Sequence, residues 1–146
     1  MAHIERFVAY STGHEPIALF GKSMSSTEQY PNIVPGIEKL VLKSLVLGNS
    51  HCAILTDDGI VRTWGQPHVG NLGLGDPFEL EVGMPGAFNS AVSAERARQG
   101  VHVDFPPVYQ PSQVHFDRPG GRSSPFCLAL AVGSWHCVAL ASYVSR

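Results

Sequence analysis

The sequence predicts an all-β fold, and three observations point to it. Glycine (15) and proline (11) are frequent in a chain of 146 residues, which disfavours long regular helices. One ten-residue stretch returns later in the chain with the same hydrophobic frame, as is typical of repeat architectures. An Asp-Gly pair between two apolar runs predicts a β-hairpin, because glycine accepts the positive φ of a tight turn.

The repeated stretch is residues 46–55, which returns as residues 131–140. A weaker echo precedes each copy, as Pro31–Val34 and Pro111–Val114, at a separation of 80 positions. The chain is therefore expected to hold two copies of one unit, with extra residues in the second. Four pairs are identical at a separation of 85 positions: Gly48/Gly133, His51/His136, Cys52/Cys137 and Leu55/Leu140.

Strands are expected at Ala53–Thr56 and Ile60–Trp64, on either side of Asp57-Asp58-Gly59. The next stretch is too rich in glycine for a helix interior. A short helix is expected at Ser93–Gln99, with Ser93 as N-cap and Gly100 as the stop. It lies within Phe78–Val108, which lacks the alternating apolar pattern of a core strand. We expect this segment to be a loop insertion, the least ordered internal stretch, and dispensable for folding.

The charge and cysteine content narrow the class of protein. A net charge of -2 and a pI near 6.4 disfavour direct binding to nucleic acid or to a membrane surface. The longest apolar runs are far shorter than the ~20 residues of a membrane span. Three cysteines (Cys52, Cys127 and Cys137), without a secretory signal or a glycosylation sequon, favour an intracellular location in cytoplasm or nucleus.

One stretch of about 30 residues resembles a repeat of the regulator of chromosome condensation family. The pattern is a Gly-x-x-His strand, an Asp-Gly turn, a Trp-Gly pair and a Gly-x-Leu-Gly-x-Gly-Asp loop. The second copy matches only as far as Leu140, and Phe20-Gly21 looks like a degenerate Trp-Gly of a preceding repeat. Pro67 stands where the family has asparagine, so that turn is expected to differ. The residues that carry the motif are Gly48, His51, Asp58, Gly59, Trp64, Gly65, Gly70, Leu72, Gly73, Gly75, Asp76, Gly133 and His136.

The resemblance implies a seven-bladed β-propeller with four strands per blade. At about 50–70 residues per repeat, this chain makes about two to two and a half blades, so we expect part of a larger propeller. The expected division is a first repeat region at 17–76, the insertion at 77–110 and an incomplete second repeat at 111–146. His51 and His136 are expected to be buried at equivalent places, where a histidine can hydrogen-bond to the backbone.

Sites with their own chemistry are not favoured by the sequence. Adjacent His and Cys on a strand point to opposite faces, so His51-Cys52 and His136-Cys137 are poor zinc ligands. No cysteine has the surroundings of an enzyme nucleophile. The loop at Gly70–Gly75 lacks the ending of a phosphate-binding loop. The acidic pairs Asp57-Asp58 and Glu79/Glu81 fit a turn and a loop. We therefore expect no catalytic residue, metal or cofactor.

The leading functional hypothesis is a non-catalytic protein-interaction module. The alternative is a guanine-nucleotide exchange factor for a small Ran-like GTPase, the founding activity of the family that the repeat resembles. Pro106, Pro107 and Tyr109 form a Pro-Pro-x-Tyr tetrapeptide with Val108, the ligand pattern of WW domains. The expected partner is thus a protein, either a small GTPase or a WW-domain protein.

The chain alone is expected to self-associate. Two blade faces of an incomplete propeller lack partners, and uncovered apolar area of that kind favours dimerisation or aggregation. The residues assigned to these faces are Val46, Ile54, Val61, Val132 and Leu140.

Overall fold

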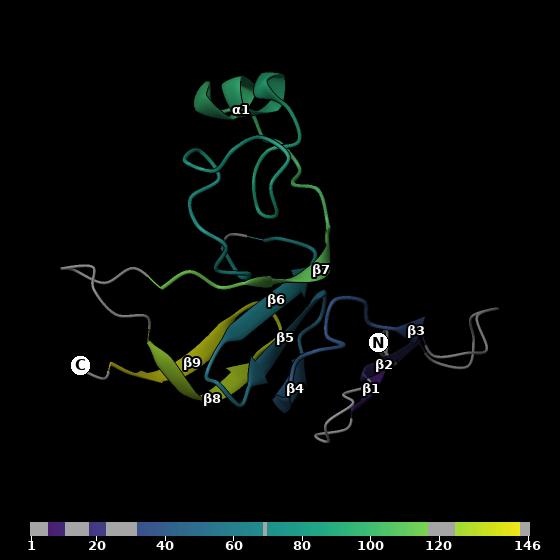
Figure 1. The fold of residues 1–146 in the computed structure, drawn as a ribbon. Helices are drawn as coiled ribbons and strands as arrows, with labels where there is room; N and C mark the ends of the chain where they lie inside the picture. Colours follow the sequence, from purple (N-terminus) through teal and green to yellow (C-terminus); the bar gives the residue numbers. More distant parts are fainter. Residues whose placement is uncertain (1–5, 11–17, 23–31, 69, 117–124, 144–146) are drawn as a thin grey trace.

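The computed structural model describes residues 6–10, 18–22, 32–68, 70–116 and 125–143 (Figure 1). Side chains are described from residue 34 onward. The described strands form three antiparallel sheets, in the orders β1-β2-β3, β4-β5-β6-β7 and β8-β9. The elements in chain order are β1 (Arg6–Tyr10), β2 (Ala18–Lys22), β3 (Asn32–Ile33), β4 (Leu42–Leu47), β5 (His51–Thr56), β6 (Val61–Gly65), α1 (Ala91–Arg98), β7 (Val108–Gln113), β8 (Phe126–Val132) and β9 (Cys137–Ser142).

The four-stranded sheet is one complete propeller blade. Strands β4, β5 and β6 follow one another as a meander, and the turn from β5 to β6 is the predicted Asp58-Gly59 hairpin, with Gly59 at φ +80°. The predicted runs therefore lie in β5 and β6, although β5 begins earlier, at His51, because its first residues also pair with β4. The blade is completed by β7, which pairs with β6 from the far side of the insertion.

Each of the three sheets corresponds to all or part of the same four-stranded repeat unit. The echo at 85 positions places β8 and β9 on the pattern of β4 and β5. The weaker echo at 80 positions places Asn32–Ile33 of β3 on the pattern of Ser112–Gln113 in β7, and each forms the outer strand of its sheet. The sheet β1-β2-β3 thus corresponds to the last three strands of a blade, and β8-β9 corresponds to the first two.

Alternation along β5 divides the complete blade between two cores, because successive side chains of a strand point to opposite faces. Cys52 and Ile54 face a core that the blade shares with the residues before β4 and after β6. Leu55 faces a second core between the blade and the sheet β8-β9. The first core contains Val34, Ile37, Leu42, Leu45, Cys52, Ile54, Trp64, Leu72, Leu74 and Val108. The second contains Leu55, Val61 and Cys127, with Val114, Phe116, Leu130, Ala139 and Ala141 packed against them.

The expectation that five apolar residues lie on uncovered blade faces is wrong for most of them. Ile54 and Val61 are fully covered, because the two cores lie on opposite faces of the same blade. Val46 and Val132 are half-buried. Leu140 alone among the five has the exposure that was expected, at 62%.

The sheets β4-β5-β6-β7 and β8-β9 pack against each other (Figure 1). Backbone and side-chain hydrogen bonds join them at both ends. The Lys43 Nζ donates to the carbonyl of Leu128 at 3.0 Å. The amide of Cys127 donates to the carbonyl of Gly59 at 3.0 Å, and the amide of Asn49 to that of Ser134 at 3.3 Å. The sheets therefore stack in a fixed register, as consecutive blades do.

The insertion between β6 and β7 projects away from the sheets and carries α1 (Figure 1). The helix begins one turn earlier than predicted, since Ser90 rather than Ser93 is the N-cap; its hydroxyl accepts a hydrogen bond from the amide of Ser93 at 3.1 Å. Gly100, at φ +78°, follows the helix as predicted. Within the described residues, no helix has the length and apolar character needed to cross a membrane.

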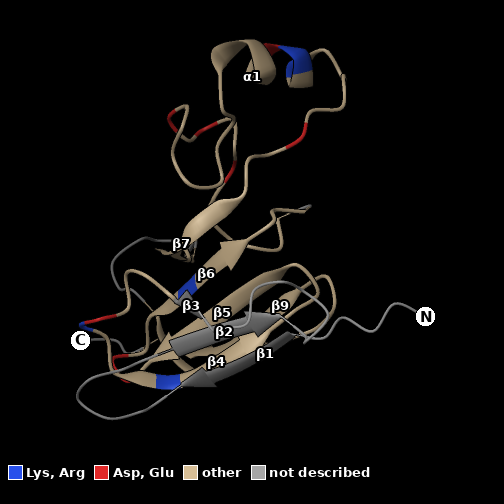
Figure 2. Ribbon diagram, turned by 90° about the vertical axis from the view of Figure 1, so that its right-hand side faces the viewer, with Lys and Arg blue, Asp and Glu red and all other residues tan. Residues whose placement is uncertain are grey.

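The insertion has more structure of its own than the sequence suggests. Phe88 is buried and contacts the rings of Phe78 and Phe105, each with a centroid distance of 5.0 Å. The guanidinium of Arg98, on α1, lies over the Phe78 ring at 5.6 Å. Several acidic positions lie along its loops (Figure 2). The sequence did not predict these contacts between phenylalanines distant in the chain. That the segment is the least ordered internal stretch and is dispensable for folding stays a prediction.

Candidate functional site

Two turns of identical sequence pattern, Gly48–His51 and Gly133–His136, lie at the junction of the two sheets. We call them the histidine turns. In each, the glycine amide donates to the histidine carbonyl at 2.8 Å. In each, the imidazole packs on the glycine: a Cβ built there would lie 2.4 Å from the His51 ring or 2.7 Å from the His136 ring. Neither glycine has a positive φ. The glycine is therefore required for space rather than for backbone conformation.

His51 is completely buried, as predicted. Neither of its ring nitrogens has a hydrogen-bond partner among the described residues, so the expected bond to the backbone is absent. Burial lowers the pKa of His51, because the charged ring cannot be solvated there; the backbone of His136, outside hydrogen-bond geometry, acts in the opposite direction. Burial between the two sheets thus favours the neutral form of the ring.

His136 is exposed, so the prediction that both histidines are buried is wrong for the second copy. The cause lies in the neighbours. Strand β5 lies between β4 and β6, and Gly65 of β6 stands opposite His51. Strand β9 pairs with β8 alone among the described strands.

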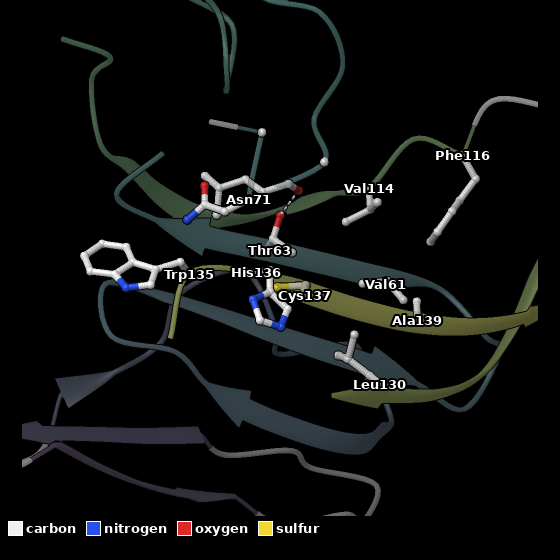
Figure 3. Close-up of a pocket in the computed structure, with 13 residues that line it drawn as sticks. Val61, Thr63, Asn71, Val114, Phe116, Leu130, Trp135, His136, Cys137 and Ala139 are labelled. Atoms are coloured by element: carbon white, nitrogen blue, oxygen red, sulfur yellow. Dashed lines mark hydrogen bonds between the residues drawn. The ribbon is translucent and has the colours of Figure 1, made fainter. Parts of the chain in front are cut away.

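A cavity of about 240 Å³ lies between β6 and β9, on the side of the blade that faces the second sheet (Figure 3). The polar groups of Thr63 and Asn71 are used by the fold: the Thr63 hydroxyl donates to the Leu72 carbonyl at 2.6 Å, and Asn71 bridges the loop after β6. The lining is otherwise mainly apolar, which suits an apolar side chain better than a polar substrate. The labelled lining residues are Val61, Thr63, Asn71, Val114, Phe116, Leu130, Trp135, His136, Cys137 and Ala139.

The Asp58-Gly59 turn serves the fold. The Thr56 hydroxyl bonds to Asp58 and accepts a hydrogen bond from the amide of Ile60 at 3.1 Å. A Cβ on Gly59 would lie 2.6 Å from the Phe126 ring of β8. Glycine is thus required both by the positive φ and by the close approach of the next sheet.

The Trp-Gly pair and the glycine loop lie at the end of β6, where the chain leaves this strand. Trp64 is buried in the first core. A Cβ on Gly65 would lie 2.4 Å from the Ser50 carbonyl oxygen, and the next amide, of Gln66, donates to that oxygen at 2.8 Å. Asn71 then accepts from the amide of His68 at 2.8 Å and donates to the carbonyl of Gln66 at 3.2 Å. This pair of bonds shapes the turn around Pro67.

The residues of the next loop also have structural roles. These residues are Gly70, Leu72, Gly73, Gly75 and Asp76. The three glycines have positive φ, and Leu72 is buried in the first core. Amides in the loop bond to loop carbonyls, as from Gly73 to Gly70 at 3.0 Å. The Asp76 carboxylate accepts from the amide of Phe78 at 2.9 Å. These hydrogen bonds stabilise the turn.

The cysteines are placed for packing. Cys52 lies in the first core while His51 lies on the opposite face, as the strand alternation predicts. In the described part of the chain, no three His, Cys, Asp or Glu side chains gather into a possible metal site. None of the three cysteines forms a disulfide. Burial raises the pKa of the Cys127 and Cys137 thiols, which makes them poor nucleophiles at neutral pH.

Sequence reasoning missed Trp135, which is 60% exposed beside the cavity. Its ring meets His68 edge-on, with centroids 5.7 Å apart. Its place within a histidine turn was the available signal, because that turn lies at the junction of the sheets. The tetrapeptide of the insertion is also at the surface: Pro107 and Tyr109 are exposed and Pro106 is half-buried.

Comparison with known proteins identifies the repeat. Residues 42–71 match the regulator of chromosome condensation (RCC1) repeat. The chain is 34% identical over 67 residues to the ultraviolet-B receptor UVR8 of Arabidopsis thaliana, a match over 46% of this chain and 15% of the receptor. The matched repeat contains β4, β5 and β6 of the complete blade, and therefore the first histidine turn and the Asp58-Gly59 hairpin.

Solved structures give the same architecture. The crystal structure of Prp20p from Saccharomyces cerevisiae, reported with its binding properties to Gsp1p and histones, superposes with a TM-score of 0.55 at 15% identity. Yeast RCC1 (Prp20) bound to Kap60 gives 0.56, also at 15% identity. Both matches cover 97% of this chain and about a third of the other, 32% and 30%. The predicted resemblance and the partial β-propeller are thus confirmed.

Proposed function

We propose that this partial propeller, with its RCC1 repeat at residues 42–71, is a non-catalytic protein-interaction module. The observation that carries the proposal is the outer face of the sheet β8-β9, by which we mean Val138 and Leu140. Both are exposed large apolar side chains, and Leu128 on the neighbouring strand is exposed as well. Contiguous exposed apolar area of this kind marks protein contact surfaces.

Strand geometry explains why this face is apolar. On β9 the side chains of Cys137, Ala139 and Ala141 point toward the complete blade, so Val138 and Leu140 point away from it. Leu140 lies opposite Ala129, and Val138 lies opposite Ala131. Because these β8 residues are small, they leave the side chains of Leu140 and Val138 exposed. The opposite face of the sheet packs against a neighbouring blade, and the outer face is also mainly apolar. It suits a second apolar sheet or an apolar protein surface.

Light scattering on the purified full chain tests the contact surface. We expect more than one copy per particle at micromolar concentration, because the outer face finds the same face of another molecule. Val138→Lys and Leu140→Lys place a charge in that contact and should shift the particle toward the monomer. Val92→Lys is the matched control, since Val92 is 71% exposed on α1, away from the sheet. A wild-type chain that stays monomeric would count against the proposal.

A second candidate is exchange-factor activity toward a small Ran-like GTPase. It is supported by the likeness in fold to Prp20p, whose reported binding properties concern Gsp1p and histones. We rank it second, because exchange needs a wide propeller face and the described residues include one complete blade. Release of a labelled nucleotide from a panel of small GTPases, with and without the chain, tests it. Accelerated release would move this candidate to first place.

The proposal extends to location and chemistry. We place the module in the reducing cytoplasm or nucleus, and the three cysteines without a disulfide agree with that. It requires no metal, cofactor or nucleic acid, and its partner is a protein. Imaging of the fluorescently tagged chain in living cells tests the location: a signal confined to the secretory pathway would contradict it.

A further inference from the structure

We propose that Pro106-Pro107-Val108-Tyr109 is a docking segment for a WW domain, presented on the outer strand of the complete blade. This inference rests on the proposed function, that of a protein-interaction module, and names one class of partner for it. WW domains bind extended proline-containing segments in aromatic grooves, using a conformation that the prolines form in advance. The tetrapeptide has the required residues in the required order.

The exposure of the four side chains fits the requirements of such a ligand. Val108 is 6% exposed and packs in the first core, whereas Tyr109 is 78% exposed. Pro107 is exposed and Pro106 half-buried. The variable position of the motif is thus the one whose side chain points into the protein. The side chains of the defining residues Pro106, Pro107 and Tyr109 remain accessible to a partner.

The segment is held in its extended form from both sides. The carbonyl of Phe105 accepts a hydrogen bond from the Gln66 Nε2 at 3.2 Å, and its ring stacks on Phe88. Val108 pairs with Gly65 of β6, and Pro111 is buried. A residue before proline is also confined to extended backbone, which applies to Phe105 and Pro106. A segment whose backbone is already ordered and extended loses less entropy on binding than a flexible one.

The position of the segment in the blade leaves it open to a partner. Strand β7 is the last in the order β4-β5-β6-β7, so it has a neighbour on one side within the described residues. Pro106 and Pro107 have no amide hydrogen, so they present rings rather than a row of donors at this edge. The Tyr109 hydroxyl makes no hydrogen bond to the described residues. An aromatic groove can therefore contact all three without displacing an existing bond.

The test is titration of the full-length chain with a purified WW domain of the class that binds Pro-Pro-x-Tyr peptides, followed by calorimetry. We expect saturable one-to-one binding. Tyr109→Ala and Pro107→Ala should each raise the Kd at least about tenfold, as anchor residues of a small interface do. Tyr109→Phe, which keeps the ring, should have a smaller effect. Gln110→Ala is the matched control, because Gln110 is exposed on the same strand and outside the motif.

A stability control and two contradicting outcomes complete the test. Because Pro107 and Tyr109 are exposed, thermal unfolding of their variants should match the wild type, which excludes a general loss of fold. Equal binding by wild type and Tyr109→Ala overturns the proposal. So does binding of the isolated peptide 103–112 without binding of the full-length chain, since the fold would then hide the motif. Either outcome leaves the outer face of β8-β9, and with it the proposed module, to be judged by light scattering alone.

Discussion

The two histidine turns share their sequence pattern and their local geometry but differ in their surroundings. In both, the glycine amide bonds to the histidine carbonyl at the same distance, and the imidazole lies over the glycine. Yet His51 is completely buried and His136 is exposed. Cys52, next to the first histidine, is buried, whereas Cys137 is half-buried. The motif therefore determines the shape of the turn, and the neighbouring strands determine whether its side chains are covered.

Substitution of the two glycines should give the largest contrast. Gly48→Ala places a Cβ against a buried ring that has no space to move, so we expect a loss of about 3 kcal/mol in the free energy of unfolding, near the upper end for overpacked cores. Gly133→Ala meets an exposed ring that can turn away, and should cost less than about 1 kcal/mol. Urea unfolding of both variants measures the difference. Equal losses would mean that the second turn is as confined as the first.

Removal of the imidazoles comes next in size. His51→Ala opens a cavity between the sheets and should cost about 2 kcal/mol, less than a fully apolar truncation, because the ring nitrogens of His51 are unpaired. His136→Ala removes a solvated side chain and should change stability by no more than about 0.5 kcal/mol. Thermal unfolding of the pair, with Gly48 and Gly133 intact, checks this. A costly His136→Ala would show that the two positions are energetically alike.

A smaller effect is expected from pH. Because burial holds the pKa of His51 below its usual value, the unfolded chain binds more protons than the folded one at mildly acidic pH. Stability should therefore be complete above the unfolded pKa of about 6.5 and fall as the pH drops through it toward the lower folded pKa. His51→Gln should lose this dependence between about pH 7.5 and pH 5, whereas His136→Gln should keep it. The free energy of unfolding, measured across that range for the three proteins, decides.

The smallest effect concerns the thiols and involves no change in stability. Cys137 is half-buried, and Cys52 and Cys127 are buried. A maleimide should therefore label Cys137 first, and the other two only when the chain unfolds. Since burial raises the pKa of the Cys137 thiol, labelling should be slow at neutral pH and quicken as the pH rises. Mass spectrometry of a time course identifies the order; early labelling of Cys52 would contradict the packing of the first copy.

The features that the sequence predicts well are those determined by a few adjacent residues. The Asp58-Gly59 hairpin, the glycine that follows the helix and the opposite faces of His51 and Cys52 all depend on local backbone geometry. The repeat itself is visible because identical turns need identical residues.

The features that the sequence did not predict depend on residues far apart in the chain. The exposure of His136 depends on which strands lie beside β9, and the small core of the insertion on three phenylalanines without a regular spacing. The start of α1 was misplaced for a more local reason: Ser90 and Ser93 are both good N-caps, and the extended backbone at Ser90 decides between them. The cavity beside Trp135 is also formed by two sheets together and has no counterpart in any single motif.

The place of β7 has a consequence for the continuity of the chain. This strand completes a blade whose other strands all precede the insertion, and the next strands, β8 and β9, pack on that same blade. If the backbone were cut at the exposed Gly100, the second fragment would remain attached at two surfaces. Each surface raises the effective concentration of the other. The insertion is thus a natural point at which to divide the chain into two fragments that reassemble into one propeller segment.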